Sequence, residues 1–275
     1  MGGTGEFEQV RSEPDPIRRG RRATELITLY QQRAAELARL RKEAIEEAHR
    51  NGLSYTEIAE RLGITKGRIS QIKSGAPPAE RAFFGVGPVA IGVPRREAAG
   101  DGRYGPADEA NDRAAQKLVE QVLARLSLVS SRFEIDPDSD EVPPGDAVVI
   151  GEPGVAPVAR NLLAGDEAVS LEKVDGEWCL VDKATGERYT SPGAGGPTTD
   201  IGFLGRREEA GRVIVQIAGV TSAGSHGVAH WLDGNVSELY EPSARSTSAI
   251  IECELDAEGA VTGSRPVAGP FTTRD

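Results

Sequence analysis

The stretch from Ile64 to Ser74 combines basic side chains with amides and hydroxyls, and it contains no acidic residue. Lysine and arginine can contact phosphate, and arginine and glutamine can also hydrogen-bond to the edges of nucleobases. A neutral unit of packed helices would not require this composition. We therefore treat this stretch as the first candidate for chemistry. A helical hairpin that binds no nucleic acid is the alternative.

Two short helices joined at a glycine are predicted to position these side chains. Ser54 and Glu57 have the spacing of a capping box, so the first helix should begin at Tyr55. Gly63 ends this helix, because a left-handed residue permits a sharp turn at that point. Thr65 can cap the second helix.

Packing two short helices at a steep angle requires small and branched residues at fixed offsets. The residues that we expect to face inward are Ile58, Ala59, Leu62, Ile64, Ile69 and Ile72. Across residues 54–74 the pattern resembles the helix-turn-helix of bacterial transcriptional regulators and of the promoter-reading region of sigma factors. The positions that match are Ala59, Gly63, Ile64, Ile69 and Ile72.

The resemblance implies that the second helix enters the major groove of double-stranded DNA. It assigns DNA binding to the outward side chains Thr65, Lys66, Gly67, Arg68, Ser70, Gln71 and Lys73. It also implies that Arg68 pairs with guanine and Gln71 with adenine, whereas Lys66, Lys73 and the hydroxyls contact phosphate.

A long amphipathic helix is predicted before this motif, over residues 23–49, because apolar residues recur at spacings of three and four. The members of this seam are Ala23, Ile27, Tyr30, Ala34, Leu37, Ala44 and Ala48. The seam can pack on the following helices or pair with a second copy of itself. We favour packing within the chain, since alanine is frequent and Arg41 interrupts a continuous zipper. Residues 1–22 are expected to form a disordered basic arm.

The pattern changes after Gly75-Ala76-Pro77-Pro78, where the prolines cannot continue a helix. We place the domain boundary here, between a helical domain at 23–78 and an α/β domain at 83–275. Short apolar strands alternate with helices in the second domain. This alternation predicts a Rossmann-like α/β sandwich with a mostly parallel sheet, helices on both faces and an antiparallel appendage.

Two strand-to-helix junctions in the second domain are candidates for binding a small anionic ligand, because such junctions meet at the carboxyl edge of a parallel sheet. The candidate residues are Gly151, Glu152, Pro153, Arg160, Gly219, Ser222, Ser225 and His226. Neither junction fits a Walker A motif or a dinucleotide fingerprint. The favoured alternative is that the glycines simply build the turns.

No catalytic set can be assembled from the sequence. Ser225 lies in a segment similar to the nucleophile elbow of α/β-hydrolases, yet the last histidine, His230, follows it within the same helix. His226 and His230 have the spacing of a metal-binding pair, but no third ligand has a spacing that would clearly place it beside them. We expect no enzymatic activity, no metal and no cofactor.

The charge is distributed unevenly along the chain, whose net charge is −11. Residues 1–82 contain fifteen Lys and Arg against twelve Asp and Glu, a net charge of +3, and the remainder contains seventeen against thirty-one, or −14. Two cysteines are too few for a disulfide scaffold or a four-cysteine metal site. No apolar run approaches the roughly 20 residues of a membrane span, so we expect a cytoplasmic protein with no membrane partner.

These features favour a sequence-specific transcriptional regulator with a ligand-sensing or oligomerisation domain, which acts on double-stranded DNA as a homodimer. One alternative is a nucleotide-processing enzyme with an N-terminal targeting module. The other is a sigma-like or polymerase-associated adaptor, although no second promoter-reading block is present.

Overall fold

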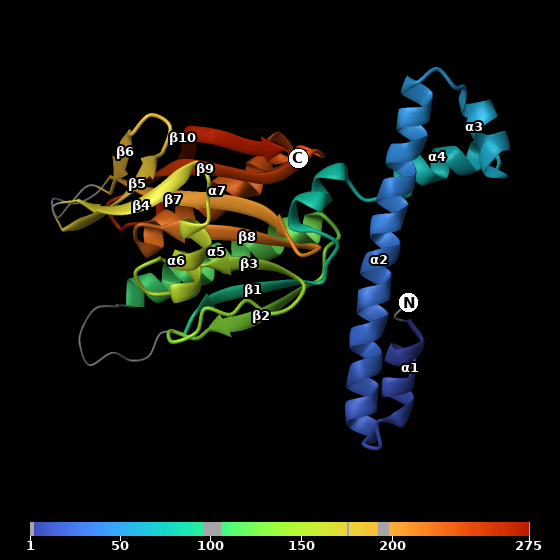
Figure 1. The fold of residues 1–275 in the computed structure, drawn as a ribbon, viewed down its shortest axis with the longest axis horizontal. Helices are drawn as coiled ribbons and strands as arrows, with labels where there is room; N and C mark the ends of the chain where they lie inside the picture. Colours follow the sequence, from blue (N-terminus) through green and yellow to red (C-terminus); the bar gives the residue numbers. More distant parts are fainter. Residues whose placement is uncertain (1–2, 96–105, 175, 192–197, 275) are drawn as a thin grey trace. The chain divides into compact units, whose positions relative to one another are not determined.

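The computed structural model describes residues 3–95, 106–174, 176–191 and 198–274. Contacts divide the chain into two compact units. Unit 1 comprises Met1–Ala79 with Val86–Pro88, and unit 2 comprises Glu80–Gly85 with Val89–Asp275. The expected combination of an N-terminal helical region and a C-terminal α/β region is confirmed (Figure 1).

Unit 1 contains the helices α1 (Gly3–Ser12), α2 (Pro16–Arg50), α3 (Tyr55–Leu62) and α4 (Lys66–Gly75). The segment 1–22, expected to be a disordered arm, differs from that expectation because α1 and the first turns of α2 lie within it. The Phe7 ring of α1 stacks on Tyr30 of α2 with 5.8 Å between centroids. The Tyr30 hydroxyl also donates to the Glu6 carboxylate at 2.9 Å. These contacts with α2 order a segment whose own sequence has little helical periodicity.

The apolar seam of α2 is covered over part of its length. Ile27 and Leu37, two predicted members, are 57% and 66% exposed, whereas Ile45, which the predicted series omits, is 2% exposed. Ile45 packs with buried residues of α3 and α4. A spacing of three and four identifies an apolar side of a helix, but the position of the partner helices decides which members of that side are buried.

The main sheet of unit 2 has seven strands in the order β10-β9-β7-β8-β3-β1-β2 among the described residues. Its strands are β1 (Val89–Pro94), β2 (Ser130–Ile135), β3 (Asp146–Ile150), β7 (Thr199–Glu209), β8 (Arg212–Gly219), β9 (Ala244–Leu255) and β10 (Val261–Arg274). The neighbours β2, β1, β3 and β8 are parallel. The pairs β8–β7, β7–β9 and β9–β10 are antiparallel.

The sheet is therefore mixed, and the expectation of a mostly parallel, Rossmann-like sheet is not confirmed. The reason lies in two hairpins that strand-helix alternation does not predict. Ala210 and Gly211, with φ of 51° and 76°, form a two-residue turn between Glu209 and Arg212, which are partners in the ladder. Left-handed residues at both positions are typical of tight hairpin turns. The second hairpin joins β9 to β10.

Helices cover both faces of this sheet. The helices α5 (Pro106–Arg125) and α7 (Ser222–Leu239) lie on one face, and the short α6 (Pro157–Ala164) lies on the other. A small antiparallel sheet of β4 (Val169–Val174), β5 (Glu177–Asp182) and β6 (Arg188–Thr190) also covers the second face. Along β8, Val215 and Ile217 pack toward α5 and α7, and Ile214 packs toward α6, as expected for a strand buried on both sides.

Two further features complete unit 2. The strands β4 and β5 form an antiparallel pair in which Val174 is the partner of Glu177. The short 3₁₀-helix η1 (Ala79–Phe84) is fixed by the buried guanidinium of Arg81, which donates to the carbonyl oxygens of Leu126 and Ser127 at 3.2 and 2.5 Å. Among the helices of the described ranges, none has the length and apolarity to cross a membrane.

Candidate nucleic-acid interface

The helix α3 begins with a complete capping box. The Ser54 hydroxyl accepts a hydrogen bond from the Glu57 N–H at 3.3 Å, and the Glu57 carboxylate accepts one from the Ser54 N–H at 2.8 Å. Hydrogen bonding to Ser54 lowers the pKa of Glu57, because it favours the charged carboxylate. The exchange satisfies backbone donors that a helix start otherwise leaves unpaired, and so fixes where α3 begins.

The turn between α3 and α4 depends on one glycine. Gly63 has φ of 66° and ψ of 30°, the left-handed conformation. A Cβ atom built at this position would meet nothing within 4 Å, so the backbone conformation and not a lack of space favours glycine. Thr65 then caps α4, its hydroxyl accepting from the Arg68 N–H at 3.1 Å.

The two helices pack with α2 around five buried apolar side chains, Ile45, Ile58, Ala59, Ile69 and Ile72. Ile64 is half-buried beside them. Leu62 was also expected to face inward but is 51% exposed. It is the last residue of α3 and lies at the edge of this cluster, where it lines an open apolar hollow together with Ile45 and Ile58.

The predicted DNA-binding residues lie together on α4 or at its cap. Six of them are exposed: Thr65, Lys66, Gly67, Arg68, Ser70 and Gln71. Lys73 is half-buried, and its ammonium donates to the Tyr55 hydroxyl at 2.6 Å. This hydrogen bond raises the pKa of Lys73. The Tyr55 ring also stacks on His49 with 4.0 Å between centroids. Lys73 therefore braces α4 against α3 and the end of α2.

Arg68 and Gln71 are paired with each other on the exposed face of α4. The Arg68 Nη1 group donates to the Gln71 Oε1 atom at 3.0 Å. Both side chains line a hollow of about 230 Å³ together with Arg41 of α2. Arg41 was not predicted as a binding residue. The signal that could have identified it is its position, because it is the charged residue that interrupts the apolar seam of α2.

The two candidate junctions for an anionic ligand meet at the carboxyl ends of β3 and β8. The Gly151 N–H donates to the Ile217 carbonyl oxygen at 3.0 Å, so these ends are neighbours. Ser225 is fully buried, and its hydroxyl accepts from the Gly219 N–H at 2.8 Å. A Cβ atom on Gly219 would lie 1.9 Å from the Thr221 carbonyl oxygen. This close packing favours the interpretation that the glycines build the turns.

The other predicted ligand residues also have partners within unit 2. Arg160 donates to the Pro153 carbonyl oxygen at 3.0 Å, and Glu152 is half-buried beside Pro153. Ser222 donates to Asp108 at 2.8 Å, and His226 lies 3.3 Å from the Asn111 side-chain oxygen. Burial lowers the pKa of His226, and the charge of His230 contributes less. Within the described ranges, no cluster of three or more His, Cys, Asp or Glu could hold a metal ion.

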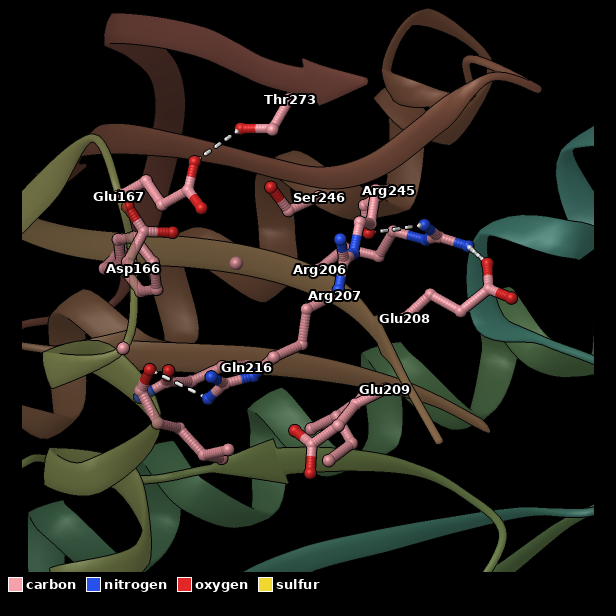
Figure 2. A pocket seen from close by; sticks show the side chains of 15 residues that line it. Asp166, Glu167, Arg206, Arg207, Glu208, Glu209, Gln216, Arg245, Ser246 and Thr273 are labelled. Atoms are coloured by element: carbon pink, nitrogen blue, oxygen red, sulfur yellow. Dashed lines mark hydrogen bonds and ion pairs between the residues drawn. The ribbon is translucent and has the colours of Figure 1, made fainter. Parts of the chain in front are cut away.

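A cavity of about 280 Å³ lies over β7 and the first half of β8, away from these junctions. Figure 2 shows that several of its polar side chains are engaged with neighbours, among them Thr273 with Glu167. Arg207 donates to the Leu162 carbonyl oxygen and Arg206 to that of Ala244, both at 2.8 Å. The Asp166 carboxylate accepts from two backbone N–H groups at 3.0 and 2.8 Å. These side chains support the surrounding loops.

Comparison with known proteins supports the interface in unit 1. Residues 35–76 match the family model of Sigma-70, region 4, a span that covers the end of α2 together with α3 and α4. No curated protein and no solved structure matches the chain significantly. Residues 35–76 are therefore a helix-turn-helix similar to Sigma-70 region 4, and the match supports a DNA-binding module.

Proposed function

We propose that the chain is a sequence-specific DNA-binding transcriptional regulator whose helix α4 lies in the major groove of duplex DNA. The observation that carries the proposal is the exposed face of α4. It presents Lys66, Arg68 and Gln71 with no acidic residue, on a scaffold fixed by a capping box and a buried core. Arg41 extends this surface onto α2. Such a surface suits contacts with both phosphates and base edges.

We assign unit 2 the role of sensing a ligand or assembling the protein into a homodimer. Its support is the charge asymmetry of the chain, since residues 83–275 carry a net charge of −14 against +3 for residues 1–82. A strongly acidic region is repelled by the DNA backbone, and so its partner is expected to be of another kind. Two copies of α4 held by such a domain would bind two half-sites.

A salt series of DNA binding tests the proposal. Binding of the full chain to the fragment upstream of its own gene should weaken steeply as salt rises, because phosphate contacts release counterions. Arg68→Ala should lower specific affinity by about 1–3 kcal/mol if the side chain reads a base. Lys117→Ala, which removes an exposed charge from α5 in unit 2, is the matched control and should leave affinity unchanged. Absence of salt-sensitive binding to duplex DNA would refute the proposal.

A second candidate is a polymerase-associated protein that directs transcription from particular promoters. The observation that favours it is the match of residues 35–76 to Sigma-70, region 4. Co-purification of the tagged full chain with RNA polymerase would support this candidate. DNA binding by the purified chain without polymerase would favour the first.

A further inference from the structure

The pairing of Arg68 with Gln71 bears on which bases α4 recognises. The two residues are three positions apart on the helix, both are exposed, and a hydrogen bond of 3.0 Å joins the Arg68 Nη1 group to the Gln71 amide oxygen. Side chains at this spacing are neighbours on a helix surface. They therefore present a single polar group to a ligand.

This polar group consists mainly of hydrogen-bond donors. A guanidinium carries five N–H donors, of which one is used on Gln71. The glutamine amide adds two N–H donors, and one lone pair of its oxygen is already occupied by Arg68. In the major groove, guanine presents two acceptors and thymine one, whereas adenine presents one acceptor and one donor. The donors of the Arg68–Gln71 pair therefore match best the edges of guanine and thymine, which present only acceptors.

The spacing of the pair also suits two adjacent base pairs. Three residues advance about 4.5 Å along a helix axis, at 1.5 Å per residue. Successive base pairs are separated by about 3.4 Å. When Arg68 lies over one base pair, Gln71 lies over the next.

We infer that Arg68 and Gln71 read two neighbouring base pairs as one unit, with Arg68 on guanine and the Gln71 amide N–H donating to an acceptor of guanine or thymine. The inference rests on the proposed function and changes the expectation from sequence, in which Gln71 pairs with adenine. A bidentate pair with adenine needs the amide oxygen as an acceptor, and in the structure one of the two lone pairs of that oxygen already accepts from Arg68, whereas both amide N–H donors remain for base acceptors.

Selection of sites from a random duplex library, with the full-length chain, tests this inference. Wild type should select guanine at one position and guanine or thymine at the next, each enriched about tenfold over other bases. In Arg68→Ala the Gln71 amide is released, so the guanine preference should disappear and the adjacent position should shift toward adenine. Because both side chains are exposed, circular dichroism should show that the variants remain folded. Lys117→Ala should select the wild-type site.

Where Arg68→Ala binds too weakly for selection, Gln71→Ala provides the second measurement. The affinity of Gln71→Ala is measured for the selected duplex and for duplexes altered at either position. The difference in affinity should shrink at both positions, because Arg68 loses the partner that orients it. Discrimination lost at the Gln71 position alone would overturn the inference, as would an adenine selected there by wild type. If wild type selects no sequence above the random library, the proposed function fails, and the inference fails with it.

Discussion

Ile58 and Leu62 lie one turn apart on α3 but have different surroundings. Ile58 is 3% exposed and belongs to the core shared with α2 and α4, whereas Leu62 is 51% exposed. We predict that Ile58→Ala destabilises the helix-turn-helix far more than Leu62→Ala, although the two changes delete the same number of carbon atoms. Leu62→Ala is thus a matched control for the loss of apolar surface from α3.

The expected difference follows from burial. Truncating a fully buried isoleucine to alanine costs about 2–5 kcal/mol, because a cavity adds to the lost transfer free energy, and we expect about 3 kcal/mol for Ile58. Burying a whole leucine stabilises a protein by roughly 1.5–3 kcal/mol, so a half-exposed leucine that leaves no closed cavity should cost about 1 kcal/mol. Each 1.36 kcal/mol corresponds to a factor of ten in an equilibrium constant.

Hydrogen exchange of the backbone amides in peptides covering residues 54–75 measures this local stability in the full chain. Exchange should accelerate about 150-fold in Ile58→Ala and about fivefold in Leu62→Ala, by the same conversion. Trp178 and Trp231, the two tryptophans of the chain, both lie in unit 2, and their fluorescence should be unchanged in either variant. Equal acceleration by the two substitutions would refute the packing of α3 described above.

Three further outcomes are expected. Lys66→Ala should make the negative slope of log affinity against log salt shallower by about 0.9, the value for one phosphate contact. An unchanged slope would show that Lys66 does not contact phosphate. Gly63→Ala should destabilise the helix-turn-helix by about 1–2 kcal/mol in the same exchange assay, because its φ of 66° is unfavourable for alanine. Asn at this position should cost less, and equal costs would contradict the conformational explanation. Because burial lowers the pKa of His226, its neutral form stabilises unit 2 fully above the unfolded-state pKa of about 6.5, and this contribution is lost as the pH falls below that value. His226→Gln should flatten the pH dependence of unfolding, measured by tryptophan fluorescence between about pH 7 and 5, and an unaltered dependence would contradict the assignment.

The helix-turn-helix is predictable from sequence because each of its signals is local. Ser54 and Glu57 cap α3, Gly63 has the left-handed conformation at the turn, and Thr65 caps α4. These interactions join residues at most four positions apart, so their spacing alone defines them. The capping box, the turn and the second cap agree with the residues chosen from the sequence.

The topology of unit 2 is less predictable because strand order depends on distant pairings. The second half of β7 consists of the charged residues Arg206 to Glu209, which give no apolar strand pattern. The sequence therefore does not reveal this part of β7 or its hairpin to β8. Pro266 and Pro270 similarly argue against a strand in the sequence of β10, which lies at an edge of the sheet. Proline is tolerated on an edge strand because its missing N–H faces no partner there. These two unrecognised strand segments account for much of the difference between the expected mostly parallel sheet and the observed mixed one.

In the candidate site, too, residue types predict the surface but not the arrangement of its side chains. Composition identifies α4 as the surface for DNA, but it assigns similar roles to Lys66 and Lys73, which the structure separates. The Lys73 ammonium is held 2.6 Å from the Tyr55 hydroxyl, whereas Lys66 is exposed. Composition also treats Arg68 and Gln71 as independent, although a hydrogen bond joins them. Which base a side chain can read depends on the groups it already binds, and these partners follow from helix packing and side-chain conformation that a list of residue types does not contain.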